Sequence, residues 1–498
     1  MSRIHAAIKA VQRTLTPCAV GLLTRRAKSS ARRPVETRAR RVRRPAALLG
    51  VSVLVVLAAA LPAIGSEAKK AEYRGWPSVA LTNGLVEVQV VPEIGGRVIQ
   101  FKLGDFEYLW VNADLAGKKP TPDGLGPGGA WLNYGGDKLW PAPQGWSGED
   151  EWPGPPDAVL DGSPHSSAIV EAAGATAAVQ LKSLEDPRSG VQFSRVIRVY
   201  DGAARVGFDS TMKNISTKVR RWGIWQVTQL STARRAGEGY NKEFRCYSPV
   251  NPGSRHPRGY AEMFGLVNNP QFGLVKSPVE GGRLFCARYQ RLVGKVGLDN
   301  SAGWVATVDG AAGYAFVERF AYFPEKKYPD NASVEFWMSG PGQIVMGGTI
   351  VDLKEDPVET PYLVESEILS PFAELRPGET ASCRLDWYAT RIGGNYPVVD
   401  CTPFGVTCVP LLARARGTTV SLEGRFGVFY SGKAVGVLLD AAGKECGKFE
   451  VKAPVSPSAP LVISAEGALP AEAVTACLVL TDAAGKTIGE VARASVRR

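Results

Sequence analysis

Two glutamates stand two residues apart in a mostly apolar segment, Glu365 and Glu367. Alternate residues of a β-strand point to the same face, so a strand here would place both carboxylates side by side. Two carboxylates that close raise the pKa of one of them, which suits a general base near neutral pH. The pattern makes one carboxylate of this pair a candidate general base. The alternative is that both are solvated residues of an ordinary strand.

A second group of candidates follows glycine pairs. One pair directly precedes Asp137 and Lys138, and the tight turn that glycine permits could project both side chains into a cleft. Another precedes Arg97, whose planar guanidinium can hold vicinal hydroxyls or a carboxylate and so could fit an acidic sugar. Arg97 could instead pair with a carboxylate of the protein itself.

Residues 112–156 are rich in Gly, Pro and Trp, and we predict a long loop there, a kind of segment that is usually functional. Its four tryptophans are Trp131, Trp140, Trp146 and Trp152. Exposed indoles can stack on sugar rings, whose hydroxyls bind amides and carboxylates. We therefore expect Trp140, Asn133 and Gln144 to contact a sugar. The alternative is that these aromatic residues cap the hydrophobic core.

Metal and cofactor chemistry has little material in this chain. Outside residues 1–65 there are two histidines, His165 and His256, and seven cysteines without a CxxC spacing. No cofactor is expected. His256 is a candidate proton donor, although a lone histidine in a basic loop is commonly a surface residue. Cys401 and Cys408 are the nearest cysteines in sequence if disulfides form.

Short segments of strand length and composition recur from residue 79 onward, bounded by Gly, Pro, Asn and Asp. We predict strands at residues 79–82, 85–91, 97–103, 106–110, 178–181, 193–200, 204–212, 222–230, 313–320 and 333–338. Asn83-Gly84 is a hairpin turn between the first two. Helical periodicity is absent, so the sequence predicts an all-β protein.

Two similar phrases mark a second unit near the C-terminus, at residues 437–449 and 478–491. Each contains an apolar strand, an Asp-Ala-Ala-Gly turn and a returning strand. This pattern predicts a small immunoglobulin-like β-sandwich over residues 400–498.

The net charge of +11 is concentrated in residues 1–65, which hold 13 Lys or Arg and one acidic residue and leave −1 for the rest. A nucleic-acid partner is therefore not expected. The basic run leads into an apolar stretch and small residues, as in an export signal cleaved near Gly65 or Ala68. We expect a periplasmic or secreted protein. The alternative is an uncleaved helix that anchors the chain in the membrane.

Four segments together resemble the galactose mutarotase-like, or aldose 1-epimerase-like, superfamily. They are residues 81–101 (LTNGLVEVQVVPEIGGRVIQF), 133–144 (NYGGDKLWPAPQ), 364–371 (VESEILSP) and 375–387 (LRPGETASCRLDW). The middle two are similar to an uncharacterised bacterial branch of it. The resemblance implies an antiparallel β-supersandwich over residues 70–395, with a sugar cleft on its concave face.

The resemblance also implies a division of chemical roles. In the epimerases a glutamate takes the proton of the anomeric hydroxyl while a histidine protonates the ring oxygen. Glu365 matches that glutamate, but Trp225 and Gln226 stand where the histidine should be. Neither can donate and recover a proton, so both are expected only to contact the sugar. Asp137, Lys138 or His256 would have to supply the acid.

Three functions remain open from the sequence. The first is a mutarotase or epimerase-like isomerase acting on a mono- or oligosaccharide. The second is a carbohydrate-binding protein without catalysis, and the third, weaker one is a protein associated with polysaccharide lyases or hydrolases. The first requires Glu365 to face Asp137, Lys138 or His256 across one site.

Overall fold

The computed structural model describes residues 65–498 apart from 146, 279–281, 347–348 and 357–358. Trp146 and the predicted leader, except Gly65, lie outside this part. The described chain is built from strands, which confirms the all-β prediction. Its helical turns are all short: η1 (Ala113–Leu115), η2 (Pro127–Gly129), η3 (Ala158–Gly162) and η4 (Pro329–Asn331). No helix among the described residues is both long and apolar enough to span a bilayer.

Thirteen strands form the first sheet, and all its pairings are antiparallel. In spatial order these are β14 (Ala261–Gly265), β17 (Gly294–Leu298), β20 (Val334–Met338), β23 (Leu363–Leu369), β12 (Arg220–Ser231), β6 (Asp137–Ala142), β4 (Arg97–Leu103), β3 (Val86–Val91), β2 (Trp76–Thr82), β1 (Ser66–Tyr73) and β8 (Ala173–Gly174), with β5 (Phe106–Glu107) beside β4 and β24 (Ala373–Leu375) beside β12.

Ten further strands form a second antiparallel sheet. Their order is β15 (Phe272–Lys276), β16 (Arg283–Arg288), β13 (Phe244–Pro249), β18 (Trp304–Asp309), β19 (Tyr314–Phe320), β25 (Thr380–Arg391), β11 (Arg205–Asn214), β10 (Val191–Tyr200), β9 (Thr176–Lys182) and β7 (Ser166–Glu171). A separate hairpin is formed by β21 (Gly342–Met346) and β22 (Thr349–Leu353).

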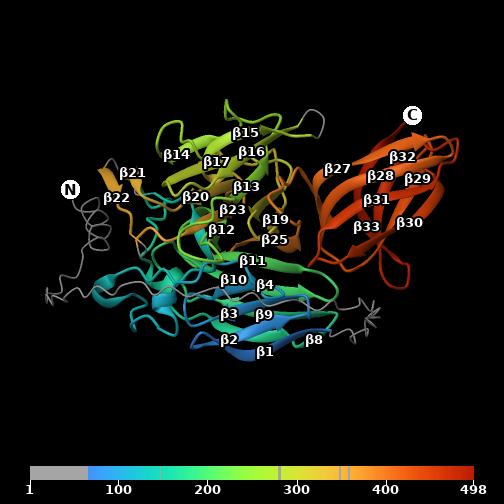
Figure 1. Ribbon diagram of the computed structural model, residues 1–498. Helices are drawn as coiled ribbons and strands as arrows, with labels where there is room; N and C mark the ends of the chain where they lie inside the picture. The colour runs from blue at the N-terminus through green and yellow to red at the C-terminus, as the bar shows by residue number, and fades with distance from the viewer. Residues whose placement is uncertain (1–64, 146, 279–281, 347–348, 357–358) are drawn as a thin grey trace, which may run out of the picture.

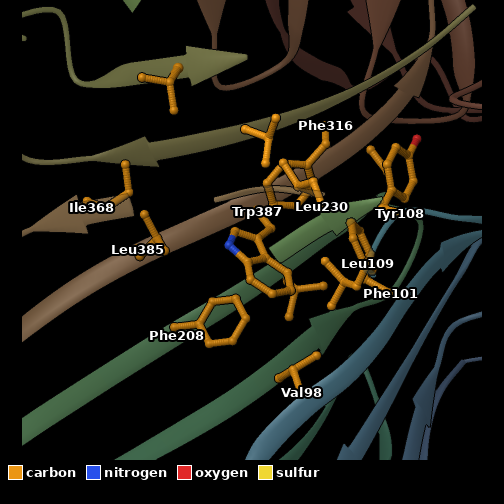
Figure 2. Close-up of a cluster of buried hydrophobic side chains, with 14 of the residues drawn as sticks. Val98, Phe101, Tyr108, Leu109, Phe208, Leu230, Phe316, Ile368, Leu385 and Trp387 are labelled. Carbon is orange, nitrogen blue, oxygen red and sulfur yellow. The ribbon is translucent and has the colours of Figure 1, made fainter. Parts of the chain in front are cut away.

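The main hydrophobic core lies between these two sheets. Trp387 of β25 is fully buried there, and Figure 2 shows it among side chains of both sheets, including Phe101 of β4 and Phe208 of β11. Alternating strands such as β10 bury every second residue in this layer. One face of the first sheet therefore belongs to the core, and the other is free to carry a site.

Strand β6 corrects the expectation of a long loop at residues 112–156. It lies in the middle of the first sheet and pairs with β12 from Asp137 to Ala142, but with β4 only at Val98. This strand was not predicted because residues 137–142 show no apolar alternation and contain Pro141, which has no N–H to donate to a neighbouring strand.

The C-terminal unit is a β-sandwich with its own core, drawn in orange and red in Figure 1. Its strands are β30 (Glu445–Val455), β29 (Gly432–Leu439), β32 (Thr475–Thr481), β33 (Thr487–Arg497), β27 (Gly405–Arg416), β28 (Thr419–Val428), β31 (Leu461–Ala468) and β26 (Asp400–Thr402). The two repeated phrases form the hairpins β29–β30 and β32–β33, and β29 pairs with β32. The seven cysteines of the described chain are free thiols, Cys401 and Cys408 included.

Candidate functional site

Strand register gathers polar and aromatic residues on the face of the first sheet that points away from the core. Lys295 of β17 pairs with Trp337 of β20, and Trp337 pairs with Glu365 of β23. Glu365 in turn pairs with Gln229 of β12. The next row of the same face carries Glu335, Glu367 and Lys138, and the row beyond it carries Trp225 and Trp140. We call these nine residues the charged face.

Solvent reaches Glu365 and Trp337 of the charged face. The Glu365 side chain is 15% exposed, whereas that of Lys138 is 1% exposed. Oε1 accepts from Gln229 Nε2 at 2.7 Å and lies 3.4 Å from Lys138 Nζ. Within the described chain Oε2 accepts no hydrogen bond, so the carboxylate is oriented through one oxygen while the other remains available. The adjacent Trp337 is half-buried.

Glu367 is fully buried, and its partners differ from those of Glu365. Its Oε2 accepts from Trp225 Nε1 at 2.9 Å and from Lys295 Nζ at 3.0 Å. The same ammonium lies 2.7 Å from Glu335 Oε2. Burial, together with the charges of Glu335 and Glu365, outweighs the attraction of Lys295 and raises the pKa of Glu367 to about 8.

The two buried lysines have similar surroundings but opposite pKa shifts. Each lies over an indole, Lys138 over Trp140 at 4.7 Å and Lys295 over Trp225 at 4.6 Å. Burial lowers the pKa of Lys138, which has one carboxylate beside it. For Lys295 two carboxylates outweigh burial and hold the pKa above its usual value. Lys295 therefore stays an ammonium.

Several polar atoms of the charged face are buried but have no hydrogen-bond partner among the described residues. They are Trp140 Nε1, Gln229 Oε1, Glu335 Oε1 and Glu367 Oε1. An unmade hydrogen bond at a buried atom costs about 1–3 kcal/mol, so such atoms are few in native proteins. Four of the sixteen such atoms among the described residues lie on this face of the sheet.

Asp137 does not share this face, which corrects the expectation that it and Lys138 project together. Successive residues of a strand alternate, so Asp137 points between the sheets. There it is fully buried, 2.6 Å from Arg195 Nη1, and accepts from Thr228 Oγ1 at 3.0 Å. Burial outweighs the Arg195 charge and raises the pKa of Asp137. Gln226 is on the same inner side, away from Glu365.

Glu318 of β19 lies in the same layer and gives a testable pH dependence. Burial, with Asp137 adding to it, raises its pKa to about 8 from 4.5. Since the folded state binds one proton more than the unfolded state between pH 4.5 and about 8, the stability that this proton brings falls across this window and is gone above about pH 8. We expect the free energy of unfolding of Glu318→Gln, relative to wild type, to rise across this window by up to about 1.4 kcal/mol per pH unit. Urea denaturation at pH 5 to 9 measures it, and parallel curves would contradict it.

The predicted sugar contacts outside this cluster are mostly engaged within the protein. Arg97 is fully buried and forms an ion pair with Asp161. This is the alternative in which Arg97 pairs with a carboxylate of the protein itself. Asn133 Oδ1 accepts from the backbone N–H of Gly135 at 3.3 Å. Gln144 lies against the loop at Gly154. These three side chains position the backbone around β6.

Of the predicted loop tryptophans, Trp140 and Trp152 are buried and Trp131 is half-buried. Trp140 packs against Trp152 at 4.8 Å and against Trp225 at 5.5 Å between ring centroids, and Trp131 donates to Asp161 at 2.6 Å. Trp140 and Trp152 therefore belong to a hydrophobic cluster. The half-buried indole beside Glu365 is Trp337, which motif analysis did not select.

His256 lies in a loop, where its Nε2–H donates to the backbone carbonyl of Asn331 at 3.2 Å. Asn331 and the preceding Asp330 both have left-handed backbone, with φ of 55° and 54°. That conformation is costly for residues other than glycine, so the imidazole contact stabilises this turn. No contact within the described chain joins His256 to Glu365.

Lys295, Glu335, Trp337 and Gln229 belong to the charged face but were not predicted from the sequence. Glu335 and Trp337 alternate with the apolar residues Val334, Phe336 and Met338 in the predicted strand 333–338, and this alternation was a usable signal. Lys295 lies in a five-residue strand that is buried throughout and carries no motif. In the described part of the chain, no group of three or more His, Cys, Asp or Glu is placed to bind a metal ion.

Solved structures similar to this chain include three from bacteria. A TPR-domain containing protein from Parabacteroides distasonis is 15% identical, with a TM-score of 0.43 over 65% of this chain and 48% of that protein, so the match spans about half of its length. A galactose mutarotase-like protein from Clostridium acetobutylicum is 12% identical, with a TM-score of 0.39 over 66% of this chain and 99% of that one. A putative aldose 1-epimerase from Escherichia coli K12 is 10% identical, with a TM-score of 0.35 over 66% and 100%.

Similarity at this level says nothing about substrate or activity. No curated protein matches the sequence. A family model described as "Domain of unknown function (DUF4380)" matches residues 77–390, which include every residue of the charged face. The chain belongs to the DUF4380 family.

Proposed function

We propose that the charged face binds a neutral mono- or oligosaccharide and that Glu365 acts there as the general base in the interconversion of its anomers. The observation that carries this proposal is the set of buried unpartnered atoms, which comprises one N–H donor and three acceptor oxygens. Sugar hydroxyls both donate and accept, so one ring can satisfy such a mixed set. The leader predicted over residues 1–65 further leads us to propose that the protein acts outside the cytoplasm.

The accessible part of the face supports the same assignment. A half-buried indole at Trp337 stands next to a carboxylate whose Oε2 has no partner in the described chain, and indole faces stack well on sugar C–H groups. Arg97, which favoured an acidic sugar, is occupied by Asp161.

A sugar-binding protein without turnover is the second candidate. Trp225 favours it, because an indole N–H held on Glu367 cannot release and recover a proton. NMR exchange spectroscopy with a panel of neutral aldoses and uronates separates the two, with calorimetry for affinity. Acceleration of anomer exchange for a neutral sugar is expected. Binding without acceleration would establish the second candidate, and no binding at all would contradict both.

Trp337→Ala tests where the sugar lies. Removing the stacking surface should weaken binding by about 1–2 kcal/mol, a 5- to 30-fold increase in Kd. Isothermal titration with the best neutral sugar measures this change. Phe323→Ala removes an exposed aromatic ring outside the charged face and should leave Kd unchanged. Equal affinities for wild type and Trp337→Ala would place the sugar elsewhere.

A further inference from the structure

The row of the charged face that holds Glu365 continues to the edge strand of the first sheet. Beyond Trp337 and Lys295, the next residue in register is Phe264 of β14, which pairs with Lys295. Phe264 is half-buried, as Trp337 is. Their strands lie about 10 Å apart, two strand spacings, yet the two ring centroids are 6.4 Å apart. The rings therefore lean toward each other above Lys295, whose side chain is only 8% exposed.

A β-bulge places Phe264 in this row. Glu262 pairs with Val296 and Phe264 pairs with Lys295, so Met263 is the extra residue between them. Without the bulge Met263 would stand opposite Lys295. Bulges re-aim side chains and are over-represented next to active sites. Here the bulge extends the accessible aromatic surface from β20 to β14.

The two rings offer separate stacking surfaces. A pyranose that stacks on Trp337 lies parallel to the indole, whereas the Phe264 ring is inclined to that indole by 69°. One sugar ring cannot stack on both, but two rings joined by a glycosidic bond can lie in different planes. Aromatic rings that are half open to solvent suit the C–H faces of neutral sugars. The pair therefore accommodates two sugar units.

The other side of Glu365 lacks such a continuous surface. Its neighbour there is Gln229, which is 1% exposed. Beyond it lies the half-buried Trp110, whose backbone N–H donates to the carbonyl of Gln229 at 2.8 Å. Trp110 points to the charged face, because the preceding Leu109 pairs with Leu230 in the core. A buried amide thus separates this indole from Glu365, and the aromatic surface is continuous only toward β14.

We propose that the site takes a neutral oligosaccharide by its reducing end, with the end ring on Trp337 beside Glu365 and the second ring on Phe264. This inference rests on the proposed function. Only the reducing end of a sugar chain has a free anomeric hydroxyl, so the chain has to leave the base on one side. The continuous aromatic surface gives that side as the one toward β14. Phe264 is then the residue that makes the site prefer a disaccharide or longer chain over a monosaccharide.

Calorimetry on the full chain with β-1,4-linked series of glucose, mannose, galactose and xylose, one to four units long, tests this inference. In the series that binds, the disaccharide should bind about 5- to 10-fold more tightly than the monosaccharide, since the second ring gains a stacking partner. The same disaccharide with its end unit reduced to an alditol has no ring for Trp337 and should bind at least about 5-fold more weakly. Equal Kd values for the reduced and unreduced disaccharide would overturn the reducing-end placement.

The ratio of the monosaccharide Kd to the disaccharide Kd locates the second ring. Phe264→Ala should bring this ratio from about 5–10 to about one. Phe264→Leu should do the same while it keeps an apolar side chain in place, and thermal melting checks that both variants fold. Trp110→Ala removes a half-buried aromatic ring of the same face and is the matched control, which should keep the wild-type ratio.

The outcomes separate this inference from the proposed function. If Phe264 only held Trp337 in position, its substitution would weaken both sugars equally and leave the ratio unchanged, which would overturn the inference. Loss of the ratio in Trp110→Ala instead would also overturn it, because the chain would run the other way. A wild type that binds monosaccharide and disaccharide equally would overturn the inference and leave the proposed function standing. No binding of any sugar would refute both.

Discussion

Replacing Glu365 with glutamine should slow anomer exchange by about 10²- to 10⁴-fold, the usual contribution of a general base. The substitution keeps the size of the side chain and a carbonyl oxygen that can still accept from Lys138 Nζ and Gln229 Nε2. It removes the basic oxygen that is free to take a proton. Sugar affinity, measured by calorimetry, should therefore change by no more than about threefold, while kcat falls.

A matched control separates this effect from a general change of charge. Glu466→Gln makes the same change at an exposed glutamate of β31, in the C-terminal sandwich. Its exchange rate should equal that of wild type. If Glu365→Gln exchanged anomers as fast as this control, Glu365 would not be the base, and the site would be a binding site only.

The strands of the first sheet were predictable where a segment of strand length is rich in apolar β-branched and aromatic residues. Residues 97–103 and 222–230 were predicted close to the bounds of β4 and β12. Strand β6 was not, because Asp137, Lys138 and Pro141 are residues that a central strand normally lacks. Its polar residues are tolerated since Arg195 and Glu365 balance their charges from opposite sides of the sheet.

The candidate site was predictable within one strand but not across strands. The spacing of Glu365 and Glu367 gives their common face directly. Lys295 and Trp337 join them only through the register of β17 and β20, and register depends on the packing of the whole sheet. The expected cleft role of Asp137 failed for a simpler reason, because adjacent strand residues cannot point the same way.

Arg195→Met should destabilise the protein by about 3–5 kcal/mol, the cost of leaving one charge of a buried pair alone. Arg195 is 5% exposed, and its guanidinium donates to Asp137 and, at 2.9 Å, to the carbonyl of Gly96. Methionine keeps most of the apolar stem, so the loss reports the charge rather than a cavity. Urea denaturation measures the change in the free energy of unfolding.

Two comparisons make the buried-pair interpretation specific. Arg205→Met breaks a pair with Asp386 whose side chains are 20% and 18% exposed, and it should cost about 1 kcal/mol or less. Adding Asp137→Asn to Arg195→Met removes the carboxylate that has lost its partner and should recover part of the lost stability. If the two sites were independent, the losses of the two single variants would add. If Arg195→Met cost no more than Arg205→Met, Asp137 would not depend on this partner. Since Asp137 directly precedes Lys138 on β6, the ion pair between the sheets also holds the lysine that orients Glu365, so stability and catalysis should decline together.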